Sequence, residues 1–136
     1  MSPEGAAVRR DGGSTAITPG LDHIALTVPD LDEQVDRLTS AFGMVVERRM
    51  GSFAVLADPV SGLKIELGRS DDSEVHFRHL GFEAEDVDGA HAGLVAAGME
   101  SGEAPHRRDL AGMYTSYLRQ RGALEVQLVK YDERQA

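Results

Sequence analysis

Apolar and polar residues alternate over residues 21–28, the first regular pattern in the chain. Ile24, Leu26 and Val28 fall on one face of this segment, as expected of a strand with one face on a core. The period then changes. Over 31–42 the apolar residues recur three to four positions apart, which predicts an amphipathic helix.

Three short strands are predicted after this helix, because turn-forming residues separate short apolar runs. Gly51-Ser52 supplies one turn and the 59–62 segment supplies another. The predicted strands cover 44–50, 53–58 and 63–68. The first half of the chain therefore follows the order βαβββ.

The second half repeats this plan when the sequence is shifted by 56 positions. The segment HIALTVPDLD (23–32) then lies over HLGFEAEDVD (79–88), so that one His and two Asp coincide. A helix follows over 87–97, and the strands predicted around it cover 76–83, 99–103, 113–120 and 124–131. Because a single offset aligns both identical residues and the order of the predicted elements, the sequence indicates a duplicated module.

These patterns predict an α+β fold with a single domain over 19–136. Module one covers 19–70 and module two covers 75–133. Residues 1–18 are rich in Gly, Ser, Ala and charge, show no period, and are expected to form a flexible tail.

Composition narrows the chemistry that such a domain can carry. The 136 residues include 14 Lys and Arg, 23 Asp and Glu, and no Cys, for a formal charge of −9. Disulfides, Cys zinc ligands and thiol nucleophiles are therefore excluded. The acidic balance argues against nucleic acid or an anionic membrane as partner. We expect a cytoplasmic protein, because the sequence has neither an apolar run of ~20 residues nor the apolar core of a secretion signal.

Metal-binding side chains gather on the strand faces opposite the core. His23 and His79 occupy equivalent positions of the repeat, and Glu66, Glu125 and Gln127 point the same way from two later strands. Two imidazoles with carboxylate and amide oxygens suit a divalent ion such as Zn, Fe, Mn, Ni or Co.

The repeated order and four segments together resemble the vicinal-oxygen-chelate superfamily. The segments are LDHIALTVPDLD, SGLKIELG, RHLGFEAEDVD and LEVQLVKY. The family includes glyoxalase I, methylmalonyl-CoA epimerase, extradiol dioxygenases and bleomycin-binding proteins. The resemblance implies a curved, mixed and mostly antiparallel eight-stranded sheet around a cavity, with the helices outside, and a homodimer. It also implies a metal-ligand set of His23, Glu66, His79 and Gln127, with Glu125 as the alternative to Gln127.

The resemblance further implies abstraction of a proton next to a carbonyl of a small oxygen-rich metabolite, with an enolate-like intermediate. An isomerase, an epimerase or a glyoxalase-type lyase would follow. The candidate bases are Glu66, Glu125 and Glu47, the last on the second strand where the epimerases carry a catalytic carboxylate. Glu47 has a second interpretation as an exposed residue beside Arg48-Arg49.

Two alternatives remain open. His23, His79 and Glu66 would also suffice to hold Fe(II) in a dioxygenase, although Gln127 departs from the Glu of those enzymes. A drug or natural product could instead be bound without metal, as in the resistance proteins. Such binding tends to use aromatic platforms, and this chain has 5% aromatic residues and no Trp.

Several residues lie off the repeat pattern. Three histidines are expected at the surface: His76, His91 on the second helix, and His106 in a loop. Arg107-Arg108 would either bind an anionic substrate or contribute surface charge. Tyr114 and Tyr117 point to opposite faces of one strand, so only one of them should line the cavity.

Overall fold

The duplicated element order predicted from the sequence is present in the structure. A computed structural model describes residues 20–120, 122 and 124–133, so the predicted tail lies outside the described residues. The first module consists of β1 (Gly20–Val28), α1 (Leu31–Ser40), β2 (Val45–Met50), β3 (Phe53–Ala57) and β4 (Lys64–Arg69). The second consists of β5 (His76–Glu83), α2 (Val87–Ala96), β6 (Glu100–Arg108), β7 (Met113–Arg119) and β8 (Glu125–Tyr131).

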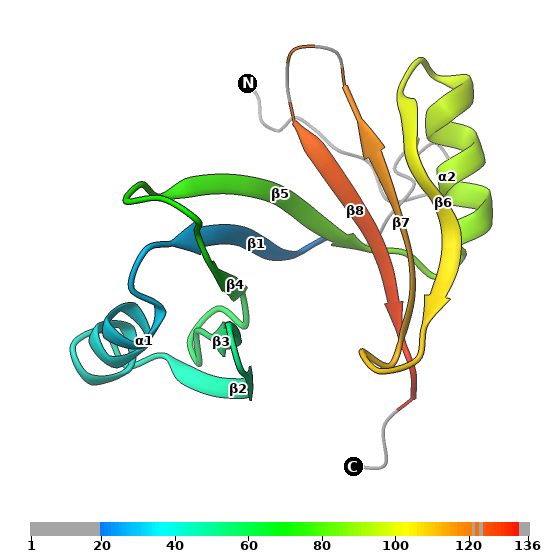
Figure 1. The fold of residues 1–136 in the computed structure, drawn as a ribbon. Helices are drawn as coiled ribbons and strands as arrows, with labels where there is room; N and C mark the ends of the chain where they lie inside the picture. The colour runs from blue at the N-terminus through cyan, green and yellow to red at the C-terminus, as the bar shows by residue number, and fades with distance from the viewer. Residues whose placement is uncertain (1–19, 121, 123, 134–136) are drawn as a thin grey trace, which may run out of the picture.

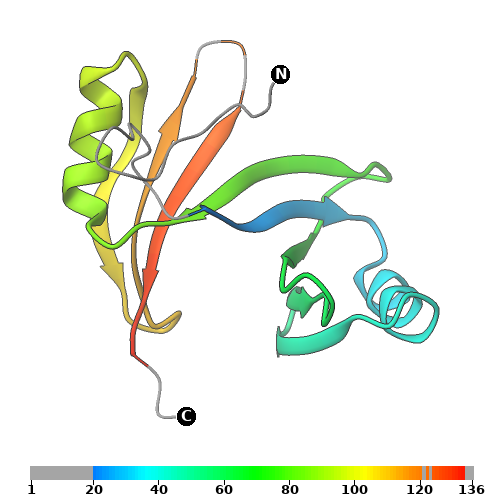
Figure 2. The ribbon, with the colours of Figure 1, turned by 180° about the vertical axis from the view of Figure 1, so that it is seen from behind.

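All eight strands belong to one sheet, in the order β2-β3-β4-β1-β5-β8-β7-β6. The pairs β1·β4 and β5·β8 are parallel and the other five pairs are antiparallel, which confirms the mixed, mostly antiparallel sheet. Figures 1 and 2 show the two modules on either side of the β1·β5 pair, with α1 and α2 on their outer sides. In the described part of the chain, no helix is long and apolar enough to cross a membrane.

Each module has its own apolar core, in which its helix packs against its strands. In module one, Leu31 of α1 packs with Leu56 and Leu67 of the sheet, and all three are nearly inaccessible to solvent. In module two, a separate cluster joins Val87 of α2 to sheet residues such as Leu128. Both helices therefore pack against the outer face of the sheet, which leaves the opposite face available for polar side chains.

The two helices begin with the same capping interaction, 56 residues apart. Asp30 Oδ1 accepts a hydrogen bond from Glu33 N at 3.1 Å, and Asp86 Oδ1 accepts one from Gly89 N at 3.0 Å. The first helix ends at Ser40, not at 42 as predicted, and Phe42 is 70% exposed. The apolar spacing thus continues beyond the end of the helix. The chain changes direction at Gly43, whose φ is +75°.

The prediction of a short strand around 99–103 was wrong in its extent. Strand β6 continues to Arg108, so His106, Arg107 and Arg108 lie on a strand and not in a loop. Its residues are mostly polar and include Pro105, so apolar alternation could not reveal it. An edge strand tolerates both features, because one side of its backbone is unpaired in the sheet.

The prediction that His91 lies at the surface was also wrong. This imidazole is 7% exposed and joins α2 to the sheet. Its Nδ1 lies 2.8 Å from Ser116 Oγ and its Nε2 lies 2.9 Å from Ser101 Oγ. Both nitrogens are therefore paired, which offsets the cost of burying the ring.

The capping interaction of α1 can be tested directly. We expect Asp30→Ala to lower the free energy of unfolding by ~1 kcal/mol, because Glu33 N loses its acceptor. The measurement is urea denaturation followed by circular dichroism. Asp36→Ala, an exposed position within the same helix, should change stability by less than ~0.5 kcal/mol. Equal effects of the two substitutions would contradict a capping role for Asp30.

Candidate metal centre

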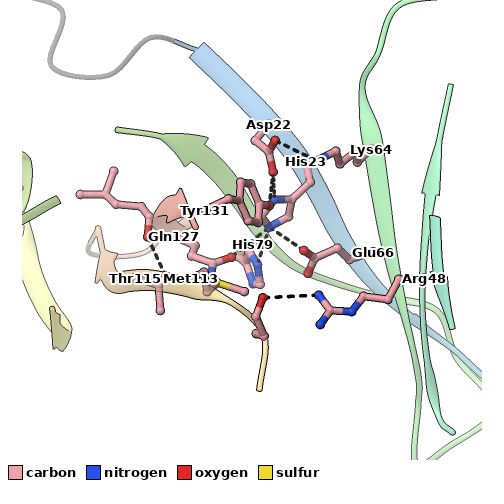
Figure 3. A network of polar contacts seen from close by, with 12 residues as sticks. Asp22, His23, Arg48, Lys64, Glu66, His79, Met113, Thr115, Gln127 and Tyr131 are labelled. Atoms are coloured by element: carbon pink, nitrogen blue, oxygen red, sulfur yellow. Dashed lines mark hydrogen bonds and ion pairs between the residues drawn. The ribbon is translucent and has the colours of Figure 1, made fainter. Parts of the chain in front are cut away.

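The four central strands of the sheet each contribute one potential ligand to a single point. His23 comes from β1 and His79 from β5, and Glu66 and Gln127 come from the flanking strands β4 and β8. Figure 3 shows these side chains turned toward one another on the inner face of the sheet. The structure therefore brings together the four residues that the sequence predicted as a ligand set.

Distances around His23 show how closely these groups approach. Its Nε2 lies 3.2 Å from His79 Nε2, 2.9 Å from Gln127 Oε1 and 3.4 Å from Glu66 Oε2. Ligand atoms of His23, Glu66 and His79 all lie within 4.8 Å of one another. Four nitrogen and oxygen atoms from four strands thus surround one small volume.

The orientation of the Gln127 amide follows from a chain of hydrogen bonds. Thr115 Oγ1 donates its only proton to Leu128 O at 2.6 Å, so it must act as acceptor toward Gln127 Nε2 at 2.8 Å. The amide nitrogen is thereby directed at Thr115 and the amide oxygen at His23. Gln127 is 2% exposed, which keeps this arrangement shielded from water.

The donor set fits a divalent cation. His23 Nδ1 lies 2.7 Å from the Asp22 carboxylate, which can only accept, so Nδ1 carries a proton and the neutral form of the ring has its lone pair on Nε2. That lone pair faces the oxygens of Glu66 and Gln127. A proton on Nε2 or a cation between these atoms offsets their mutual repulsion, and two imidazoles with two oxygens are ligands that Zn²⁺ and related ions accept.

Burial sets the protonation of the groups in this cluster. It lowers the pKa of His79 to about 4. His79 is therefore neutral near pH 7 and keeps a lone pair for a metal. Burial also raises the pKa of the Glu66 carboxyl, an effect that His23 partly opposes.

Gly81 provides the space that His23 occupies. These two residues are paired across β1 and β5, and a Cβ at position 81 would lie 2.0–2.5 Å from three atoms of the His23 ring. No side chain can approach so closely without displacing the ring. The absence of a side chain at 81 is therefore a requirement of the site.

An open cavity of about 1180 Å³ adjoins the cluster, between the two modules. Its lining includes Glu66, His79 and Gln127 from the cluster, and Val55 and Leu110 from opposite modules. A smaller cavity of about 300 Å³ shares Glu66 and His79 with it. The candidate ligands are thus accessible to a small molecule, as a catalytic site requires.

The other two predicted carboxylates lie on the cavity walls. Glu47 lines the larger cavity, with its Oε1 at 3.9 Å from Lys64 Nζ. Glu125 lines the smaller cavity. Among the described residues, the cluster of close His and carboxylate atoms does not include Glu125. Gln127, whose Oε1 lies 2.9 Å from His23 Nε2, is the nearer candidate for the fourth ligand.

In each of the pairs Arg107/Arg108 and Tyr114/Tyr117, one residue lines the cavities and the other does not. Arg107 forms ion pairs with Asp109 and Asp132, two residues at the wall of the larger cavity, whereas Arg108 itself lines both cavities. Tyr117 lines both cavities and contacts the His79 ring edge-on, with ring centroids 5.4 Å apart. Tyr114 donates instead to Asp88 of α2 at 2.7 Å.

Asp22 is a site residue that the sequence analysis missed. Strict alternation places it on the face opposite His23, but β1 has an irregular register between Leu21 and His23. A bulge of this kind changes the direction of a side chain. Burial by itself raises the pKa of the Asp22 carboxyl, but hydrogen bonds from His23 and Tyr131 and the charge of Lys64 hold it below its usual value.

Filling the space at position 81 should disrupt the centre. We expect Gly81→Ala to displace His23, to lower the free energy of unfolding by ~1–3 kcal/mol and to weaken metal binding. Chemical denaturation and metal titration measure the two effects. Gly68→Ala is the matched control, because its Cβ would meet no atom closer than 3.4 Å. Wild-type stability and metal binding in Gly81→Ala would show that His23 is not confined as described.

Comparison with known proteins places this architecture in a family. The Glyoxalase/Bleomycin resistance protein/Dioxygenase superfamily profile matches residues 20–122. No curated protein sequence matches the chain. A methylmalonyl-CoA epimerase from Mycobacterium tuberculosis superposes with a TM-score of 0.74 at 22% identity, covering 88% of this chain and 93% of that one.

A second solved structure is similar over a comparable length. It is a methylmalonyl-CoA epimerase from Streptomyces coelicolor in complex with 2-nitronate-propionyl-CoA, with a TM-score of 0.70 and 21% identity. The match covers 85% of this chain and 99% of that one. At these identities the structural likeness establishes the fold, and the profile match establishes the family. The chain belongs to the Glyoxalase/Bleomycin resistance protein/Dioxygenase superfamily.

Proposed function

We propose that the protein is a divalent-metal-dependent enzyme of the isomerase or epimerase type. It would move a proton at a carbon next to a carbonyl of a small oxygen-rich substrate. The observation that carries this proposal is the convergence of His23, Glu66, His79 and Gln127 beside an open cavity. A small-molecule substrate and a cytoplasmic homodimer, both expected from the sequence, belong to the same proposal.

The four converging residues would hold the ion. A bound divalent ion supplies a positive charge that binds adjacent substrate oxygens and stabilises negative charge developing on them. The open side of the cluster faces the cavity, where a substrate can approach. Gln127 is fixed by Thr115 and contributes a neutral oxygen, so the ligand set carries one carboxylate charge rather than two.

Proton abstraction needs a carboxylate that is not engaged by the ion. Glu66 belongs to the ligand cluster, since it lies 3.4 Å from His23 Nε2. Glu47 and Glu125 therefore remain as bases. We favour Glu47, because it lines the same large cavity as His79 and Gln127, whereas Glu125 lines only the smaller one.

The structural neighbours suggest the first substrate to test. One neighbour is a methylmalonyl-CoA epimerase in complex with methylmalonyl-CoA and ammonium, at 21% identity and a TM-score of 0.69. This thioester has a carbonyl next to an ionisable carbon and further oxygens that can chelate. Methylmalonyl-CoA and other thioesters of branched diacids are thus the candidate substrates.

A second candidate function is an Fe(II) dioxygenase. Its support is the group of His23, Glu66 and His79, because two imidazoles and one carboxylate are the ligands of many non-haem Fe(II) oxygenases. Oxygen consumption with a catechol substrate, in protein loaded with Fe(II), distinguishes this function from the epimerase proposal.

The metal proposal predicts a stoichiometric ion. Wild-type protein should bind one equivalent of Zn²⁺ or Co²⁺, measured by elemental analysis after dialysis, and His23→Ala and His79→Ala should retain less than a tenth of it. His76→Ala is the control, since His76 lies on β5 as well but contacts the exposed Asp72. Full metal content in both site variants would refute the proposed centre. Metal-free wild type that binds a planar compound tightly would instead favour sequestration of a drug or natural product.

The choice of base gives a separate prediction. We expect Glu47→Gln to slow exchange of the substrate α-proton with deuterated water by ~100-fold or more, because a general base is lost. Proton NMR of methylmalonyl-CoA measures the exchange, and metal content should stay at the wild-type level. Glu125→Gln is the matched comparison and should stay within ~3-fold of wild type. The reverse result would assign the base to Glu125.

A further inference from the structure

We propose that Asp22 is a positioning residue that makes His23 the rigid ligand of the centre and leaves His79 as the adaptable one. The inference rests on the proposed metal centre and extends it to residues outside the ligand set. Asp22 would act through His23 and would not itself contact substrate or metal.

Three strands meet at the Asp22 carboxylate. Its Oδ2 lies 2.7 Å from His23 Nδ1 and accepts a hydrogen bond from Tyr131 OH of β8 at 2.6 Å. Its Oδ1 lies 3.6 Å from Lys64 Nζ of β4, and the Asp22 side chain is 8% exposed. Lys64 Nζ also lies 4.8 Å from the centre of the Tyr131 ring. The carboxylate is therefore fixed from β4 and β8 as well as from β1.

This arrangement fixes both the rotation and the tautomer of His23. A carboxylate only accepts hydrogen bonds, so His23 Nδ1 must carry a proton and Nε2 is directed at the other ligands. His23 is 1% exposed and is confined further by the backbone of Gly81. A metal-ligating imidazole held by a carboxylate at its other nitrogen is oriented and made a stronger donor.

The second module lacks this support. The residue equivalent to Asp22 under the 56-residue repeat is Arg78, which lines the smaller cavity. Among the described residues, no carboxylate makes a hydrogen bond or ion pair with His79. This ring is partly exposed and contacts Tyr117 edge-on. The duplicated scaffold thus holds one histidine through both nitrogens and the other less tightly.

Lys64 shows a matching difference between the modules. In the strand alignment that places Glu66 over Gln127, the counterpart of Lys64 is Glu125. Module one therefore has an acidic residue, Asp22, before its histidine and a basic residue, Lys64, on β4. Module two has a basic residue, Arg78, before its histidine and an acidic residue, Glu125, on β8. Among the described residues, only the first combination pairs a carboxylate with the ligand histidine, because Glu125 forms no hydrogen bond or ion pair with His79 and lies outside the cluster of close His and carboxylate atoms.

Metal affinity tests the inference without any activity assay. We expect Asp22→Asn to weaken Zn²⁺ or Co²⁺ binding by ~10–100-fold in competition with a chromophoric chelator. Asp72→Asn is the matched control, since Asp72 contacts the exposed His76 at 2.9 Å and should leave affinity unchanged. Asp22→Glu, which restores the charge, should recover part of the loss. Equal affinity of Asp22→Asn and wild type would overturn the proposal.

Nitrogen-15 NMR of the histidine rings gives a readout that a purely structural role would not affect. In metal-free wild type at pH 8, His23 should carry its proton on Nδ1, and this measurement needs no variant that could fail to fold. A proton found only on Nε2 would overturn the inference. If His23→Ala and His79→Ala lose metal but Asp22→Asn does not, Asp22 is excluded and the centre stands. If neither His variant loses metal, the centre itself is wrong.

Discussion

The antiparallel pairing of β1 with β5 is the interaction on which the rest of the site depends. It joins the two modules, and its register sets Ala25 opposite His79 and His23 opposite Gly81. Both imidazoles therefore lie on the same face of the sheet, with their Nε2 atoms 3.2 Å apart. A shift of one residue in this register would turn one ring to the other face and separate the ligands.

The strands β4 and β8 flank the β1·β5 pair and complete the proposed centre. Both helices pack on the opposite face of the sheet. β4 contributes Glu66 and β8 contributes Gln127, so each module provides one histidine and one oxygen donor to the proposed centre. The two apolar cores lie under α1 and α2 on the outer face. Because those cores bury the apolar side of the strands, the inner face can carry polar groups beside a cavity without loss of packing.

The duplicated modules give the fold an approximate internal symmetry, but the polar residues of the candidate site do not all repeat. The histidines and the helix caps repeat at the same offset, but Asp22 is replaced by Arg78 in the second module. Glu66 is likewise replaced by a neutral amide. The proposed centre would thus combine a fixed ligand with an adaptable one, which would suit a site that binds and releases a substrate.

The sequence by itself determined the modules, the face of each central strand and the four candidate ligands, because strand alternation and helix period are local properties of the chain. Tertiary structure decided three further features. Asp22 turns toward His23 at an irregularity in the β1·β5 register, His91 is buried with hydrogen bonds to serines of β6 and β7, and the polar β6 pairs with β7. Each depends on contacts between separate helices and strands, which the apolar pattern within one element does not encode.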